Sequence, residues 1–182
     1  NKGVVSLDKE GNRLFVFSAD GTLTPPYVDN QRILFGAGSE LISVKTSGGL
    51  NWRKDIAKFW RSKPVVDGNT IYVGSTDNGL YAVSLSDGEK EWRAETNGWV
   101  IGNAFVDSGL VYFGSNDGHI YAVNKATGQL LWKARTAQAV QSTPTPGTMG
   151  GKDAIFAGST DNNLYAIDRN TGQVLSKFLA QD

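Results

Sequence analysis

Short apolar segments alternate with turn-forming residues along most of the chain, and the pattern recurs at a fixed interval. Residues 71–92 read IYVGSTDNGLYAVSLSDGEKEW and residues 111–132 read VYFGSNDGHIYAVNKATGQLLW, an offset of 40 without a gap. Residues 155–176 (IFAGSTDNNLYAIDRNTGQVLS) follow after a further 44, and residues 33–52 (ILFGAGSELISVKTSGGLNW) are a shortened copy. Repetition of a unit of about 40 residues indicates a repeat architecture.

Each unit predicts four short strands. In the unit that ends at Trp92, the first strand is Pro64–Val66, the second is Ile71–Val73, the third is Leu80–Val83, and the fourth carries Trp92 itself. Asp-Asn-Gly and Asp-Gly sequences separate the later strands, because these residues accept the positive φ angles of tight hairpin turns. Four strands in each 40-residue unit, with no helix between them, predict the blades of an all-β propeller.

The whole chain, residues 1–182, is predicted to form a single propeller domain. Four complete blades are expected, at approximately 25–55, 64–95, 104–135 and 143–182. We expect a segment of a larger propeller, and a closed four-bladed ring is the alternative. The open blade edges of such a segment can template strand addition, so a homo-oligomer is a further expectation for the isolated chain.

Residues 1–24 predict only a partial blade. Two strands are recognisable, Val4–Leu7 and Leu14–Phe17. The second of them aligns with Leu80–Val83, and in this alignment Pro26 falls where Trp92 should be.

Composition narrows the functional classes. Eighteen Lys and Arg residues balance eighteen Asp and Glu residues, so binding to nucleic acid or to an anionic membrane is not indicated. No apolar run approaches 18 residues, so no transmembrane segment is expected. The lack of cysteine excludes disulfides and thiol nucleophiles but leaves the compartment open. Because the chain begins at Asn1, we expect a removed targeting segment or a longer parent protein.

The segments Ala82–Trp92 (AVSLSDGEKEW) and Ala122–Trp132 (AVNKATGQLLW) resemble the docking motif of the quinoprotein-type, or PQQ-like, β-propeller repeat. The resemblance covers nearly the whole chain, and it implies that a tryptophan of each blade stacks on the alanine- and glycine-containing backbone of its neighbour. The docking residues are then Trp52, Trp92 and Trp132. Ser176 replaces the last tryptophan and the segment Ser43–Trp52 is one residue short, so weaker docking is expected at these two blades.

Members of this family differ in function. Some are dehydrogenases that bind pyrroloquinoline quinone and calcium. Others are scaffolds, such as the propeller lipoprotein of the outer-membrane β-barrel assembly machinery, and others are extracytoplasmic sensor domains. The resemblance therefore implies an extracytoplasmic location, in the periplasm or at the cell surface, but it implies no single activity. The dehydrogenases use eight blades and a vicinal disulfide, which this sequence does not offer, so no cofactor is expected.

Polar residues that recur with the repeat are interpreted as turn residues. The recurring acids and amides are Asp77, Asn78, Asn116, Asp117, Asp161 and Asn162. Their oxygens suit a hard cation, but their periodic recurrence favours hairpin turns. His119 is the only histidine, and without a second imidazole or a fixed acid partner it is interpreted as a surface residue. The recurring serines, which lack a paired histidine, are Ser75, Ser115 and Ser159. No catalytic residue and no metal site are predicted.

The crossings between blades, at residues 56–63, 97–103 and 137–143, depart from the repeat. Arg61, Ile101 and Gln141 occupy one equivalent position of the 40-residue period. Aromatic residues and arginine are enriched in protein interfaces. We therefore predict a binding rim at one mouth of the axial funnel, made of Lys58, Trp60, Arg61, Trp99 and Gln141. The alternative is that both tryptophans only fill space beside the inner strands.

These observations predict a non-enzymatic scaffold that binds a protein or peptide partner, or another ligand, through the rim. The first alternative is a part of a quinoprotein oxidoreductase whose missing blades supply the cofactor ligands. The second alternative is an extracytoplasmic sensor domain that binds a small ligand.

Overall fold

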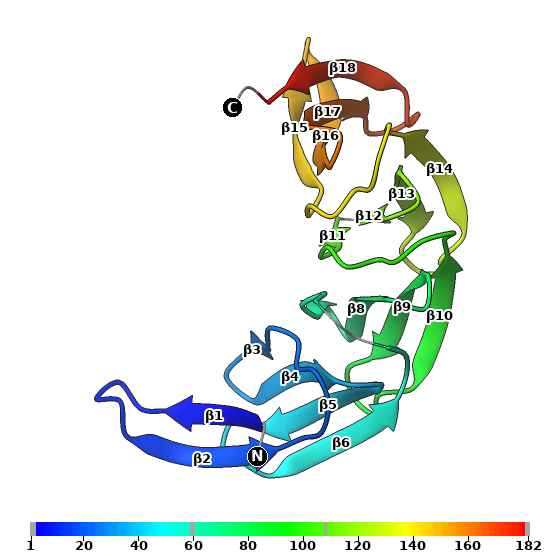
Figure 1. The fold of residues 1–182 in the computed structure, drawn as a ribbon. Coiled ribbons are helices and arrows are strands. Elements are labelled where there is room, and N and C mark those ends of the chain that lie inside the picture. The colour runs from blue at the N-terminus through cyan, green and yellow to red at the C-terminus, as the bar shows by residue number, and fades with distance from the viewer. Residues whose placement is uncertain (1–2, 59–60, 108, 181–182) are drawn as a thin grey trace.

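The computed structural model describes residues 3–58, 61–107 and 109–180, and every regular element in these ranges is a β-strand. Four antiparallel sheets of four strands follow a two-stranded hairpin. We number these units blades 1 to 5 along the chain. Figure 1 shows the blades following one another along an open arc, with their first strands on the concave side and their last strands on the convex side.

The strand bounds follow the repeat. Blade 1 contains β1 (Gly3–Leu7) and β2 (Arg13–Ser18). Blade 2 contains β3 (Tyr27–Val28), β4 (Arg32–Ala37), β5 (Glu40–Lys45) and β6 (Leu50–Asp55). Blade 3 contains β7 (Val65–Asp67), β8 (Thr70–Ser75), β9 (Gly79–Ser84) and β10 (Lys90–Glu95). Blade 4 contains β11 (Phe105–Val106), β12 (Leu110–Ser115), β13 (His119–Asn124) and β14 (Leu130–Arg135). Blade 5 contains β15 (Thr145–Met149), β16 (Lys152–Ser159), β17 (Asn163–Asp168) and β18 (Val174–Leu179).

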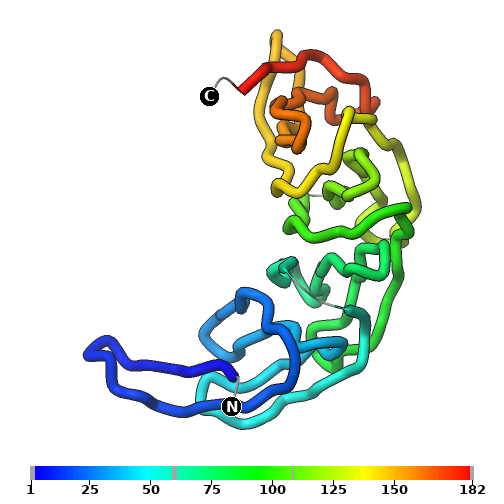
Figure 2. Tube along the Cα trace, viewed as in Figure 1, coloured from blue at the N-terminus to red at the C-terminus, as the bar shows by residue number. Residues whose placement is uncertain are grey.

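This arrangement confirms the predicted all-β propeller with four complete blades and one partial blade. The alternative of a closed four-bladed ring is not the arrangement found. Figure 2 traces the chain along the arc and shows that β1 and β2 lie at one end while β18 lies at the other.

The hydrophobic core lies between blades rather than inside them. On β8, Ile71 and Val73 pack in a cluster with Leu34 and Leu41 of blade 2. Tyr72, the residue between them, packs on the opposite face with residues of blade 4. Successive side chains of a strand point to opposite faces of the sheet. Since both faces of each inner blade are covered, its middle strands are apolar at consecutive positions instead of alternating.

One aromatic ring recurs at each contact between complete blades. The indole Nε1 of Trp52 donates to the carbonyl oxygen of Leu85 at 3.1 Å, and those of Trp92 and Trp132 donate to the next blade at 3.0 Å. Each ring lies against a turn glycine with positive φ in that next blade. The three glycines are Gly88, Gly128 and Gly172. Trp52 makes the same type of hydrogen bond as the other two tryptophans, so its shortened segment does not remove the contact. Weaker docking at this blade stays a prediction.

The sequence alignment assigned Leu14–Phe17 to the wrong strand position of the partial blade. β2 leads directly into the crossing to β3, so it is the fourth strand of its blade and β1 is the third. Phe15 pairs with Ser6 just before a bulge, as Trp52 pairs with Ser43 just before a bulge. Phe15 also lies against Gly48, the turn glycine of blade 2. The docking position of blade 1 is therefore filled by Phe15, and Pro26 has no part in it.

The docking glycines can be tested against a glycine of similar backbone conformation. Gly128 has φ +70° and an added Cβ would lie 2.6 Å from the Trp92 ring, whereas Gly68 has φ +59° and no atom within 4 Å. Alanine at either position adopts a left-handed conformation, which costs about 1–2 kcal/mol. Gly128→Ala also displaces the ring, so its loss in the free energy of unfolding should exceed that of Gly68→Ala by about 1–3 kcal/mol. Equilibrium urea unfolding measures both losses, and equal losses would contradict the docking account.

Candidate functional site

Side chains from three consecutive crossings meet at one small pocket. The pocket has a volume of about 200 Å³, and its lining residues are Arg61, Trp99, Ile101, Asn116 and Gln141. Within it the side-chain amide of Gln141 donates to the Asn116 side-chain oxygen at 3.2 Å. Trp99 keeps 43% of its surface exposed. The pocket therefore combines an accessible indole with a guanidinium and a pair of amides.

The structure brings together three of the five residues predicted for the binding rim, which are Arg61, Trp99 and Gln141. Lys58 is not in the pocket lining. Its side chain is exposed, and its carbonyl oxygen accepts a hydrogen bond from the Ser75 hydroxyl at 2.9 Å. Trp60 lies outside the described residues. Whether the rim binds a partner is still a prediction.

Two lining residues were missed from the predicted rim. Ile101 shares its place in the period with Arg61 and Gln141, and equivalent positions of successive blades converge toward the propeller axis. That shared position was the available signal. Asn116 was interpreted only as a turn residue, and it enters the pocket because the backbone amide of Asn116 donates to the Trp99 carbonyl oxygen at 2.8 Å.

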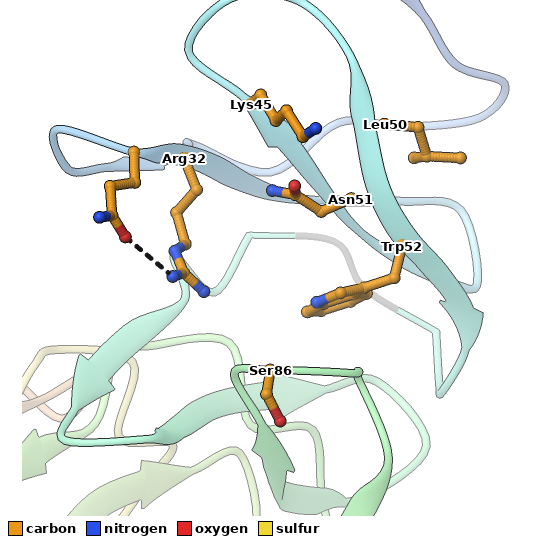
Figure 3. A pocket seen from close by; sticks show the side chains of 7 residues that line it. Arg32, Lys45, Leu50, Asn51, Trp52 and Ser86 are labelled. Carbon is orange, nitrogen blue, oxygen red and sulfur yellow. Dashed lines mark hydrogen bonds between the residues drawn. The ribbon is translucent and has the colours of Figure 1, made fainter.

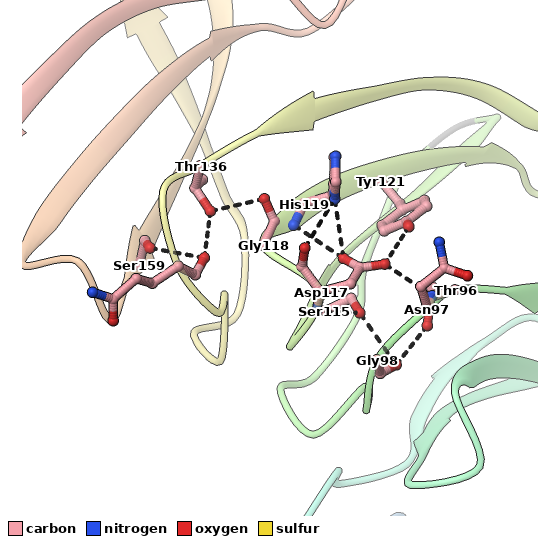
Figure 4. Close-up of polar contacts among 11 residues, drawn as sticks. Thr96, Asn97, Gly98, Ser115, Asp117, Gly118, His119, Tyr121, Thr136 and Ser159 are labelled. Carbon is pink, nitrogen blue, oxygen red and sulfur yellow. Dashed lines mark hydrogen bonds and ion pairs between the residues drawn. The ribbon is translucent and has the colours of Figure 1, made fainter.

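A buried carboxylate fixes the crossing that carries Trp99. In Figure 4, Asp117 lies between the hydroxyl of Tyr121 and the backbone amide of Asn97, which donate to its Oδ2 at 2.6 Å and 2.9 Å. The Ser115 hydroxyl donates to the Gly98 carbonyl oxygen at 3.2 Å. The hairpin of blade 4 therefore holds the loop that arrives from blade 3.

An equivalent aspartate makes the same two types of hydrogen bond in blade 5. Asp161 accepts from the Tyr165 hydroxyl at 2.6 Å and from the backbone amide of Ala137, in the preceding crossing, at 3.1 Å. In blade 3, Asp77 likewise accepts from the Tyr81 hydroxyl at 2.7 Å. The repeated acids thus hold turns and loops together, which is a structural use of the residues interpreted as turn formers.

His119 has an acid partner, contrary to the sequence-based expectation. Its Nδ1 lies 3.2 Å from Asp117 Oδ1, and its backbone amide donates to the same oxygen at 3.1 Å. The two residues are neighbours in the hairpin, and the imidazole is partly buried beside the Tyr121 ring. The interpretation of His119 as an unpartnered surface residue was therefore wrong.

The hydrogen bonds that reach the carboxylates govern their acidity. Burial, the largest influence, raises the pKa of Asp117, but hydrogen bonds from Tyr121, Asn97 and Ser115 together hold that pKa below 3.8. The pKa of Asp161 falls to about 2 for the same reason, again against the effect of burial. The tyrosine of such a pair is affected in the opposite direction: burial and the hydrogen bond to Asp77 raise the pKa of Tyr81 to about 12.

The described residues 3–58, 61–107 and 109–180 contain no group of three or more His, Asp or Glu side chains placed to hold a metal ion. The same ranges contain no helix with the length and hydropathy needed to cross a membrane.

The chain as a whole is similar to several known proteins. A family model described as outer membrane protein assembly factor BamB matches residues 37–178. No curated protein matches the chain in sequence. The crystal structure of BamB from Moraxella catarrhalis is similar, with a TM-score of 0.76 and 18% identity, over 96% of this chain and 57% of that one.

Two enzymes share the fold at lower identity. A europium-containing methanol dehydrogenase has a TM-score of 0.79 and 13% identity, over 93% of this chain and 45% of that one. Quinohemoprotein alcohol dehydrogenase from Comamonas testosteroni has a TM-score of 0.77 and 13% identity, over 94% of this chain and 39% of that one. The chain thus spans between 39% and 57% of the length of these structures.

The acidity of Asp161 predicts how stability depends on pH. Its pKa of about 2 in the folded chain lies below the 3.8 of a free carboxyl, so ionised Asp161 stabilises the fold above about pH 4. This contribution is lost as pH falls from about 4 to 2, through the folded pKa. Asp161→Asn keeps an acceptor oxygen but cannot titrate, so it should flatten the loss of unfolding free energy over that range.

Urea unfolding at a series of pH values measures this profile. Asp55→Asn, which removes an exposed carboxylate at the end of β6, is the matched control, and Asp161→Asn should flatten the slope more than this control does. A slope that is identical in Asp161→Asn and in the unmodified chain would show that the bonds to Tyr165 and Ala137 do not stabilise the ionised carboxylate.

Proposed function

The chain belongs to the family whose model is described as outer membrane protein assembly factor BamB, and on that premise we propose that it is a non-enzymatic scaffold. In this proposal a protein partner docks on the crossing-loop face, at the pocket lined by Arg61, Trp99 and Gln141. The observation that carries the proposal is the convergence of three crossings, each with a different side chain, on one accessible pocket. We place the protein outside the cytoplasm, in the periplasm or at the cell surface, on the same family ground.

The side chains of the pocket suit recognition of a polypeptide. Exposed tryptophan and arginine dominate the binding energy of many protein interfaces, because each offers a large contact area together with hydrogen-bond donors. Ile101 adds an apolar surface next to Trp99. The amides of Gln141 and Asn116 supply donors and acceptors for a peptide backbone.

Rigidity is what the propeller contributes. The backbone of the crossing at Trp99 is held by Asp117 on one side and by the bond from the Val100 amide to the Ser75 carbonyl oxygen, 3.0 Å, on the other. A loop that is already ordered loses little conformational entropy when a partner binds. The scaffold therefore acts by presenting a fixed surface, and it needs no catalytic group.

Site-specific photo-crosslinking in the full-length protein, in its own cells, tests this proposal. A photoreactive residue in place of Ile101 should give a discrete adduct with an extracytoplasmic protein. The same residue in place of Lys133, on the outer strand of blade 4, is the control and should give none. Adding Trp99→Ala should lower the yield at position 101 at least tenfold, since truncation of an interface tryptophan commonly costs about 2 kcal/mol or more.

Equal yields at positions 101 and 133 would contradict the proposal. An unchanged yield in the Trp99→Ala variant, with circular dichroism and thermal unfolding intact, would also contradict it. Because Trp99 is already 43% exposed, its removal should leave the fold in place.

A second candidate is a part of a quinoprotein oxidoreductase, and the similarity to two alcohol dehydrogenases favours it. In that case the remaining blades would supply the ligands for the cofactor. Titration of the chain with pyrroloquinoline quinone and calcium tests it directly. A saturable change in absorbance together with a rise in melting temperature would support the enzyme, and no change in either would count against cofactor binding by this chain.

A further inference from the structure

A larger pocket lies between blades 2 and 3, on the face opposite the crossings. It has a volume of about 560 Å³, and its lining residues are Gln31, Arg32, Lys45, Leu50, Asn51, Trp52 and Ser86. Figure 3 shows Arg32 from β4, Lys45 from β5 and Trp52 from β6 around one space, with Ser86 of blade 3 below it. None of these lining residues is acidic.

The two cations of this pocket are direct neighbours in the sheet. Arg32 of β4 pairs with Lys45 of β5, so both side chains project from the same face. Like charges directly opposite each other destabilise a β-ladder. Within the described residues, Lys45 has no carboxylate within ion-pair distance. We therefore expect the positive charge of Lys45 to be unfavourable next to Arg32.

The repeat provides an internal comparison. The pairs equivalent to Arg32 and Lys45 are Thr70 with Ser84 in blade 3, Leu110 with Asn124 in blade 4, and Ala154 with Asp168 in blade 5. None of these pairs carries a positive charge. The corresponding pocket between blades 3 and 4, of about 360 Å³, also contains Glu91 at the position of Asn51. Of these two pockets, only the one between blades 2 and 3 has two positively charged side chains and no carboxylate in its lining.

Arg32 also makes an ion pair and a hydrogen bond that stabilise the contact between blades 2 and 3. At the next two blade contacts a cation of the following blade pairs with a turn aspartate, as Lys125 does with Asp67 and Arg169 with Asp107. Leu85 replaces that cation in blade 3, and Arg32 pairs with Asp29 at 3.5 Å instead and donates to the Leu85 carbonyl oxygen at 3.1 Å. Asp29 therefore balances the positive charge of Arg32, and no carboxylate of the described residues pairs with Lys45.

From this charge pattern we propose that the pocket between blades 2 and 3 binds a small organic anion through Arg32 and Lys45. A carboxylate or phosphate group lies between the guanidinium and the ammonium, because charge-assisted hydrogen bonds to these donors are the strongest available there. Asn51 and Ser86 supply neutral donors, and the rest of the ligand lies along the Trp52 ring and Leu50.

Two substitutions test the proposal, and each introduces the residue that blade 3 has at the equivalent position. Lys45→Ser introduces the residue of Ser84 and Asn51→Glu introduces that of Glu91, so both residues already occur at equivalent sites of the fold. The probes are inorganic phosphate and citrate, with chloride at matched ionic strength as the reference, and two-dimensional NMR follows the backbone amide of residue 51 and the Trp52 indole. Each variant should weaken binding of both probes about tenfold or more. Lys45→Ser removes a charge-assisted hydrogen bond, and Asn51→Glu places a carboxylate next to the bound anion.

Gln129→Glu adds a negative charge in the turn before β14, away from this pocket, and it is the matched control. Its affinity for the probes should stay within about twofold of the unmodified chain. Binding of phosphate alone or citrate alone with this variant pattern supports the site and identifies the anionic group it prefers. The proposal fails if neither probe gives saturable shifts at Asn51 and Trp52, or if Gln129→Glu weakens binding as much as Asn51→Glu does.

Lys45→Ser has a second consequence that does not depend on the probes. Because it removes a like-charge neighbour of Arg32, it should raise the melting temperature in low salt without added anion, and the rise should shrink as salt increases. Lys133→Ser, on the outer strand of blade 4, is the matched control and should not show this salt-dependent rise. A lower melting temperature for Lys45→Ser in low salt would show that Lys45 stabilises the fold, which contradicts the unfavourable pairing on which the proposal rests.

Discussion

Each inner blade of this propeller needs a neighbour on both sides, and the contact between blades is completed by an aromatic ring on a glycine. Trp92 shows the requirement: its ring can approach the backbone of blade 4 only because Gly128 has no Cβ, and its indole then satisfies a carbonyl oxygen of the same turn. The contact is both apolar and directional. Since the middle strands are apolar on both faces, a blade that lost this contact would expose a whole sheet face to water.

The position of the candidate site follows from that contact. The docking contacts hold neighbouring blades together, and residues of the crossings that follow blades 2, 3 and 4 line one pocket. The aspartates then fix the loops themselves, with Asp117 holding the crossing that carries Trp99 and Asp161 the next one. The anion pocket uses the same docking contact from its other side, because Trp52 both contacts blade 3 and lines the cavity.

Most of the fold could be predicted from the sequence because the repeat is nearly exact at the strands and turns. The error lay in blade 1, where apolar character alone matched Leu14–Phe17 to a third strand. The pairing of Phe15 with Ser6 before a bulge is a feature of register, and hydrophobic pattern does not encode it. Phe15 was therefore not recognised as the docking residue.

The candidate site could be predicted less completely. The 40-residue period is enough to place Arg61, Ile101 and Gln141 at equivalent positions, but Asn116 and the partner of His119 depend on how a hairpin meets the loop beside it. Lys58 was included for its charge and its neighbours in sequence, although its side chain does not line the pocket. The pairing of Arg32 with Lys45 joins residues of two strands, and only the register of those strands reveals it.

The central claim is that neighbouring blades stabilise one another through the docking contacts, and native-state hydrogen exchange tests it most directly. Amides in the middle strands of blades 3 and 4, which are β9 and β13, each belong to a blade covered on both faces. If the contacts hold the blades together, these amides exchange through one shared opening whose free energy equals that of global unfolding. Separate opening free energies for the two blades, well below the global value, would show that each blade is stable by itself and would contradict the account.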